Sequence, residues 1–198
     1  MAFVDLAARK IAMTVVYYGP AGSGKTACIR HVYARTGGAQ AAPPRDDHRR
    51  GYYDLLPLQL GEIRGFRTHF DLLSVPSGDA AAETRRALLE KVDGVVFVAD
   101  GREERGAANA ASLAELRVFL STHGLDLALL PYVVQVNHAD APSAASPATT
   151  ATPLIRWHPQ PAAVPVLTTV ATTGAGVFEA LKAISRLCLA ELKRSRNG

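Results

Sequence analysis

The sequence predicts one α/β domain, residues 1–198, with a mostly parallel sheet and helices on both of its faces. Three observations lead to this fold class. Apolar, β-branched segments alternate along the chain with segments in which apolar residues recur every three or four positions. The first apolar segment runs directly into a glycine-rich loop. The chain has 198 residues, of which 48% are hydrophobic and 20% charged, as is usual for a globular domain of this size.

Six segments should form strands, because each is short, rich in β-branched or aromatic residues and bounded by turn residues. Residues 55–63 and 67–75 flank an Arg-Gly pair, which favours an antiparallel hairpin. Residues 94–100 and 130–137 are continuous apolar runs, typical of strands covered on both faces. The other two strands are expected at 11–19 and 164–171. The expected sheet is therefore six-stranded and parallel, except for one antiparallel edge hairpin.

Helices should connect these strands, because the intervening segments carry apolar residues at helical spacing. They are expected at 25–36, 81–92, 109–124 and 176–194. Two further segments lack such a pattern. Residues 35–51 are expected to form a loop, and residues 139–165, rich in Ala, Pro, Ser and Thr, are expected to be irregular.

Composition argues against several classes of protein. The apolar runs are too short to span a bilayer, and the N-terminus lacks the pattern of a signal peptide. Cys28 and Cys188 are read as reduced thiols, so a cytoplasmic protein is expected. The formal net charge of +4 is mild, and the basic clusters are interpreted as solvated surface. No transmembrane segment and no nucleic-acid partner are expected.

The residues Gly19 to Thr26 fit the phosphate-loop pattern G-x-x-x-x-G-K-[ST] in full, between an apolar strand and a helix. Small residues let backbone N–H groups turn inward around phosphate oxygens, and the following helix points its positive end at the same place. The side chain of Lys25 would reach the β- and γ-phosphates, and the Thr26 hydroxyl would bind Mg²⁺. The expected phosphate-binding residues are Gly19, Ala21, Gly22, Ser23, Gly24, Lys25, Thr26 and Ala27.

Guanine is the expected base. Asn137 and Asp140 form an N-x-x-D pattern at the end of a strand, with His138 between them. A carboxylate at Asp140 would accept hydrogen bonds from N1–H and the exocyclic amine of guanine, whereas adenine would present an acceptor there. The segment 169–181 resembles the last guanine loop of Ras-like GTPases. That resemblance implies that the backbone N–H of Ala171, followed by Thr172, meets the guanine oxygen.

Almost the whole chain resembles the MglA-type family of bacterial Ras-like small GTPases, which act in gliding motility and cell polarity. The resemblance rests on "VVYYGPAGSGKT", "YYDLLPLQLGEIRGFRTHFDLLSVP", "VDGVVFVAD", "ASLAELR", "LPYVVQVN" and "TGAGVFEALKA", of which "LPLQLGEIRGF" is not general to P-loop proteins. It implies a Ras-like G domain that binds GTP or GDP with Mg²⁺, with residues 35–51 as a switch I-like loop. It also implies a roadblock/LC7-type partner similar to MglB, and leaves polarity or motility effectors possible.

The first switch departs from the family pattern. Counting back from "YYDLLP", Arg50 stands where the family has a Thr that senses Mg²⁺ and the γ-phosphate, and Arg49 stands at the family's Arg. Arg49 is therefore the candidate catalytic residue, because its charge would stabilise the transition state.

The second switch, the phosphate loop and the guanine motif also depart. The family's "VPGQ" is replaced by Val-Pro-Ser-Gly-Asp, and neither Gly78 nor Asp79 restores the glutamine that orients water. Ala21 replaces a glycine, and His138 replaces a lysine that lies along the guanine ring, where an imidazole would stack instead. These changes affect transition-state contacts more than binding contacts, so the expectation is a nucleotide-binding switch or scaffold with weak or lost hydrolysis.

Three alternatives stay open on the sequence. One is an active GTPase whose site is completed by Arg49 or by a partner. Another is a nucleotide-free pseudo-GTPase that serves as an interaction protein. The third, a P-loop kinase or ATPase, leaves Asp140 unexplained and lacks a supporting lid. The apolar positions Tyr52, Tyr53, Leu55 and Leu56 are equally compatible with an edge strand of the core and with a partner surface.

Overall fold

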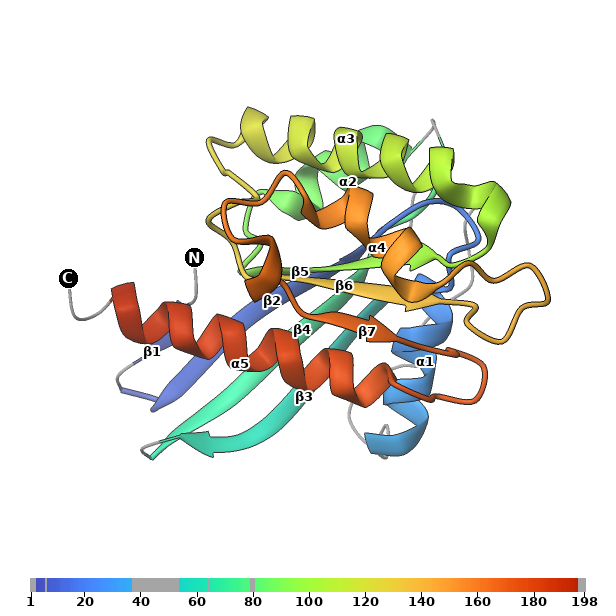
Figure 1. Cartoon of the computed structure of the whole chain (residues 1–198). Coiled ribbons are helices and arrows are strands. Elements are labelled where there is room, and N and C mark those ends of the chain that lie inside the picture. The colour runs from blue at the N-terminus through green and yellow to red at the C-terminus, as the bar shows by residue number, and fades with distance from the viewer. Residues whose placement is uncertain (1–2, 6, 37–53, 64, 79–80, 196–198) are drawn as a thin grey trace.

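The protein is a three-layer α/β domain in which helices cover both faces of one seven-stranded sheet (Figure 1). The computed structural model describes residues 3–5, 7–36, 54–63, 65–78 and 81–195. The strands are β1 (Phe3–Asp5), β2 (Lys10–Tyr18), β3 (Asp54–Ile63), β4 (Phe66–Ser74), β5 (Gly94–Asp100), β6 (Tyr132–Asn137) and β7 (Val166–Thr168). The helices are α1 (Lys25–Thr36), α2 (Ala82–Leu89), α3 (Gly106–Thr122), α4 (Pro147–Ile155) and α5 (Val177–Ser195), with 3-10 turns η3 (Glu103–Arg105) and η4 (Pro161–Ala163).

The strand order is β3-β4-β2-β5-β6-β7, and the four pairings from β4 to β7 are parallel. β3 pairs antiparallel with β4 at the edge, which confirms the expected hairpin. The chain leaves β2, returns on one side as β3 and β4, and continues on the other side as β5. The end of β2 is therefore the switch point of the sheet, where α/β proteins bind their ligands.

Two apolar cores fill the spaces on either side of the sheet. One lies under α2, α3 and α4 and includes the fully buried Leu89, Leu116 and Leu120. The other lies under α1 and α5 and includes Ile29 and Ile184. Figure 1 shows the two sets of helices on opposite faces. Because β5 and β6 are covered on both sides, all of their residues are buried, as their continuous apolar sequence predicts.

The fold class is confirmed, and two details differ from the sequence expectations. A seventh strand, β1, pairs antiparallel with the start of β2, although the first residues carry no strand pattern of their own. The segment 139–165, expected to be irregular, contains α4.

Helix α4 forms because hydrogen bonds cap both of its ends and one of its faces is buried. Ser146 caps the helix by accepting a hydrogen bond from the Thr149 N–H at 3.1 Å, and a proline occupies the first turn, where it costs no hydrogen bond. Ala151 and Leu154 are buried against the sheet. Trp157 then closes the helix end by donating its indole N–H to the Leu154 carbonyl at 2.7 Å.

In the described part of the chain, no helix combines the length and the apolar composition that crossing a membrane requires.

A close approach at the start of β5 gives a test of the packing between sheet and helix. A Cβ on Gly94 would lie 2.6 Å from Cys188 Sγ and 3.1 Å from Ile184 Cδ1 of α5. Gly94→Ala should therefore destabilise the protein by roughly 2 kcal/mol, the usual cost of overpacking a core. Chemical denaturation of Gly94→Ala with and without Cys188→Ala checks this. The second substitution should recover part of the loss, and two independent, additive losses would contradict the packing described.

Candidate functional site

The loop after β2 is a tight glycine turn that side chains would not fit. Gly19 has φ +144° and Gly24 has φ +97°, a region that favours glycine. A Cβ on Gly19 would overlap the Val98 carbonyl, and one on Gly24 would overlap the Asn137 side chain. The turn passes into α1 without a break, because Cys28 N–H donates to the Gly24 carbonyl at 3.0 Å. Both glycines are therefore required by close packing against neighbouring strands.

A pocket of about 450 Å³ opens on this turn. The residues that surround it come from the glycine turn, from the first turns of α1 and from the loop after β4. They are Ala21, Gly22, Gly24, Lys25, Thr26, Ala27, Arg30, Val75 and Ser77. Most of the residues expected to bind phosphate thus border one cavity, and Ser77 from the second switch borders it too.

The Lys25 ammonium lies at the base of this pocket and is almost fully buried. Its Nζ donates to the carbonyls of Gly19 and Pro20 at 2.8 and 2.9 Å, and to the Ser77 hydroxyl at 3.1 Å. Burial lowers the pKa of Lys25 to about 8, and the positive charge of Arg85 acts in the same direction. A buried cation held only by neutral oxygens attracts an anion strongly, because none of these ligands cancels its charge.

Thr26 lies in a group of oxygens that the sequence alone did not reveal. Its hydroxyl donates to Asp54 Oδ2 at 2.7 Å and lies 3.4 Å from the Ser74 hydroxyl. The hairpin register makes Asp54 the direct partner of Ser74, which brings both beside the first turn of α1. Asp54 is 4% exposed, and its Oδ1 is buried without a hydrogen-bond partner in the part of the chain that the structure describes. Four oxygens, one of them an unsatisfied carboxylate oxygen, suit a hard cation such as Mg²⁺.

The buried carboxylate of Asp100, at the end of β5, helps to hold the glycine turn through the arginines that it binds. Asp100 accepts two hydrogen bonds from the Arg102 guanidinium, at 2.9 and 2.6 Å, and one from Arg105 at 3.2 Å. Burial alone would raise the pKa of Asp100, but the hydrogen bonds from Arg102 outweigh it and hold this pKa below its ordinary value. Arg105 also donates to the Ala21 carbonyl at 2.7 Å. The ion pair therefore fixes the outer end of the turn.

Asn137 joins three loops of the site. Its amide donates to the Ser23 carbonyl at 2.8 Å, and its Oδ1 accepts from the Ala171 N–H at 2.9 Å. The same oxygen accepts from the Thr169 hydroxyl at 3.3 Å. The Ala171 N–H, expected to meet a guanine oxygen, is thus paired within the protein. Asn137 and Ala171 are brought together with the glycine turn, where Asn137 ties the turn to the end of β7.

His138 and Asp140 follow β6 and differ in environment. His138 has φ +61°, and its Nε2 lies 3.0 Å from the Gly22 carbonyl. Because a carbonyl only accepts, the imidazole proton is on Nε2. The edge of the ring thus contacts the glycine turn, and the expected stacking of its face on a base stays a prediction. Asp140 and Thr172 are exposed.

The loop after β4 is held by Arg85 of α2, which forms a partly buried ion pair with Glu115 of α3. Arg85 donates to the carbonyls of Pro76 and Gly78 at 3.3 and 2.6 Å and to Glu115 at 2.6 Å. Tyr18, the residue before the glycine turn, donates to the other oxygen of Glu115 at 2.5 Å. Burial and the Glu115 carboxylate raise the pKa of Tyr18, so the phenol stays protonated and keeps donating.

Three positions considered in the sequence, Arg49, Arg50 and Asp79, lie outside the described residues, as do Tyr52 and Tyr53. On the edge strand β3, Leu56 is buried and Leu55 is 44% exposed. Leu56 thus belongs to the core of the edge strand, whereas a partner surface at Leu55 stays a prediction.

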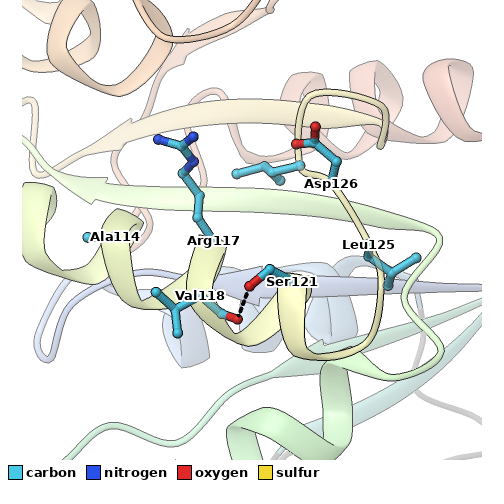
Figure 2. A pocket seen from close by; sticks show the side chains of 7 residues that line it. Ala114, Arg117, Val118, Ser121, Leu125 and Asp126 are labelled. Atoms are coloured by element: carbon cyan, nitrogen blue, oxygen red, sulfur yellow. Dashed lines mark hydrogen bonds between the residues drawn. The ribbon is translucent and has the colours of Figure 1, made fainter.

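A second depression, of about 570 Å³, lies along α3 and the loop that follows it. Figure 2 shows Ala114, Arg117, Val118 and Ser121 on one side of it and Leu125 and Asp126 on the other. It is far from the glycine turn in the fold and lacks the convergent donors of the first pocket, so we assign it no ligand.

The chain is 41% identical, over 198 residues, to the mutual gliding-motility protein MglA of Myxococcus xanthus (strain DK1622). The match covers 98% of this chain and 99% of that protein. The chain belongs to the MglA family. No protein-family model matches the sequence. Of the expected departures from the MglA pattern, Ala21, Ser77 and His138 lie on or beside the glycine turn, whereas Arg50 and Asp79 lie outside the described residues.

The role of Asn137 as a tie between loops gives a testable consequence. Asn137→Ala leaves the Ser23 carbonyl and the Ala171 N–H without their partner, and should lower the free energy of unfolding by roughly 3 kcal/mol even without ligand. Asp140→Ala, three residues away and exposed, is the matched control and should be neutral without ligand. Denaturant titration measures both. Equal stability of the two variants would refute the tie.

Proposed function

We propose that this chain binds a guanine nucleotide with Mg²⁺ at the glycine turn, and that it acts as a regulatory switch or scaffold with weak or lost GTP hydrolysis. The observation that carries this proposal is the buried Lys25 ammonium at the base of a pocket formed by backbone and small side chains. Such a pocket suits the phosphates of a nucleotide, which need N–H donors and a positive charge. Membership of the MglA family agrees with it.

The phosphates would be held by the backbone of residues 21–26 and by Lys25. The cation would be bound by Thr26, with Asp54 and Ser74 beside it, because the buried Asp54 Oδ1 lacks a partner in the described chain. When bound, Mg²⁺ supplies positive charge that shields the phosphate oxygens. Asp54 thus takes part in a role that the sequence analysis gave to Thr26 alone.

The base would lie against the loops after β6 and β7. Asp140 is exposed there and has the acceptor geometry that guanine, unlike adenine, satisfies with two donors. Asn137, His138, Ala171 and Thr172 would form the surroundings of the base. Since Asn137 and His138 are both bonded to the glycine turn, base and phosphate sites are mechanically connected.

Weak hydrolysis is proposed because the described part of the second switch carries no water-orienting group. Ser77 borders the phosphate pocket, which supports the alignment that places it at the family's glycine and Gly78 at the glutamine. Ala21 adds a methyl group at the mouth of the same pocket. Loss of a contact made only in the transition state lowers turnover and spares binding. Arg49 stays the candidate for residual charge stabilisation.

Gliding motility or cell polarity is the proposed process, since the related Myxococcus protein is named for gliding motility. A roadblock/LC7-type protein similar to MglB is the proposed partner. The edge strand β3 would serve as its docking surface, because Leu55 is exposed and no strand in the described part of the chain pairs with the outer side of β3. An active GTPase completed by this partner is the second candidate function.

Nucleotide binding is tested by thermal unfolding of the full chain with GDP, GTP and ATP, each with Mg²⁺. We expect GDP or GTP to raise the Tm and ATP to have little effect. Lys25→Ala and Asp140→Ala should each abolish the shift, while the surface controls Lys182→Ala and Asp126→Ala should retain it. Absence of any shift in the unaltered protein would support a nucleotide-free scaffold and contradict the proposal.

Hydrolysis is tested by single-turnover assays with bound GTP, followed by phosphate release with and without a roadblock protein. We expect turnover well below that of an ordinary Ras-like protein, because no glutamine is available to orient water. Ser77→Gly combined with Gly78→Gln restores the family pattern and should raise the rate. Rapid hydrolysis by the unaltered protein alone would favour the active-GTPase reading.

A further inference from the structure

Ser77 is the third and last ligand of the Lys25 ammonium. A lysine ammonium has three N–H donors, and here they go to the carbonyls of Gly19 and Pro20 and to the Ser77 hydroxyl. The carbonyls belong to the glycine turn itself and move with Lys25. Ser77 belongs to a different loop, after β4, and its contact is the longest of the three, at 3.1 Å. The second phosphoryl group would meet Lys25 on the side of the glycine turn, whereas a third would lie toward the loop after β4 and would displace Ser77.

The position of Ser77 is built into the fold, because the residues on both sides of it are held. The Arg85 guanidinium donates hydrogen bonds to the carbonyls of Pro76 and Gly78, which fixes the backbone immediately before and after Ser77. Arg85 is 6% exposed and is itself fixed by Glu115, which accepts from Tyr18. Moving the backbone and Cβ of Ser77 away from Lys25 thus requires a rearrangement of this partly buried ion pair, whereas the hydroxyl alone can rotate about the Cα–Cβ bond.

The side chain of Ser77 matters for the terminal phosphate in particular. In a phosphate loop the lysine bridges the two outermost phosphoryl groups of a triphosphate. A diphosphate leaves the outer part of this site empty, so Ser77 can keep its place beside Lys25. A third phosphoryl group needs both the volume and the N–H donor that Ser77 uses. Glycine, the family's residue here, offers neither Cβ nor hydroxyl and would leave that space open.

We infer that Ser77 is a specificity-determining residue that makes this chain prefer the nucleoside diphosphate over the triphosphate. The inference rests on the proposed nucleotide site and adds to it a bias toward the diphosphate-bound state. The cost falls on the triphosphate alone, because the diphosphate does not compete with Ser77. In this chain the second switch therefore acts as a steric and hydrogen-bonding block rather than as a sensor of the third phosphate.

The test compares the affinities of the full chain for GDP and for a non-hydrolysable GTP analogue, both with Mg²⁺. We expect GDP to bind on the order of tenfold more tightly, the change that one hydrogen bond to a charged group produces. Ser77→Gly should bring the ratio close to one by tightening the triphosphate, with GDP affinity unchanged. Ser77→Ala, which keeps the Cβ, should lie between, and Ser77→Thr should retain the preference. Ser121→Ala, on the exposed face of α3, is the control.

The outcomes separate this inference from the proposed function. Equal affinities in the unaltered protein, or a weaker triphosphate complex in Ser77→Gly, would overturn the inference while leaving the nucleotide site intact. The second result would mean that the hydroxyl holds the third phosphate. No binding of either nucleotide would overturn the proposed function and the inference with it. Unfolding temperatures without ligand are measured for each Ser77 variant, and affinities for both nucleotides that fall together with stability, at an unchanged ratio, would also overturn the inference.

Discussion

The turn between β2 and α1 is the constraint on which the rest of this site depends. Its backbone can pass between Val98 and Asn137 only because Gly19 and Gly24 lack side chains and adopt positive φ. The same close passage places the Ser23 carbonyl on the Asn137 amide and the Gly22 carbonyl beside His138. A loop that looks flexible in sequence is therefore one of the most closely restrained parts of the molecule.

Among the described residues around this turn, the Lys25 ammonium has hydrogen-bond partners but no carboxylate partner. Arg102 and Arg105 neutralise Asp100, and Arg85 is paired with Glu115. The Lys25 ammonium meets only neutral oxygens, although it is almost fully buried and lies in the field of Arg85. On the other side of the pocket, the buried Asp54 carboxylate keeps one oxygen unpaired in the described chain. A polyphosphate bound with a divalent cation would complement both groups. The negative phosphate would pair with the Lys25 ammonium, and the cation would pair with the Asp54 carboxylate.

Three of the expected departures from the family pattern, Ala21, Ser77 and His138, lie on or beside the same turn. Ser77 contacts Lys25, which would bind the outermost phosphate of the proposed nucleotide. Ala21 lines the pocket, and His138 connects the glycine turn to the loop after β6. The backbone donors and Lys25 are kept. This distribution is what a protein would show if it kept nucleotide binding as a signal while losing turnover, because binding and transition-state contacts come from different residues.

The sequence alone determined the features that depend on neighbouring residues. The strand, glycine turn and helix around Lys25 follow from local conformational preference, and the buried strands β5 and β6 follow from their continuous apolar runs. The tertiary structure decided what depends on distant segments. Helix α4 exists because Ala151 and Leu154 find a buried face, although its composition favours irregular chain. Asp54 becomes a neighbour of Thr26 through the register of the β3–β4 hairpin, and Arg85 reaches Glu115 across thirty residues. Such contacts carry no local signal, because packing and strand pairing, not sequence spacing, set the distances between these side chains.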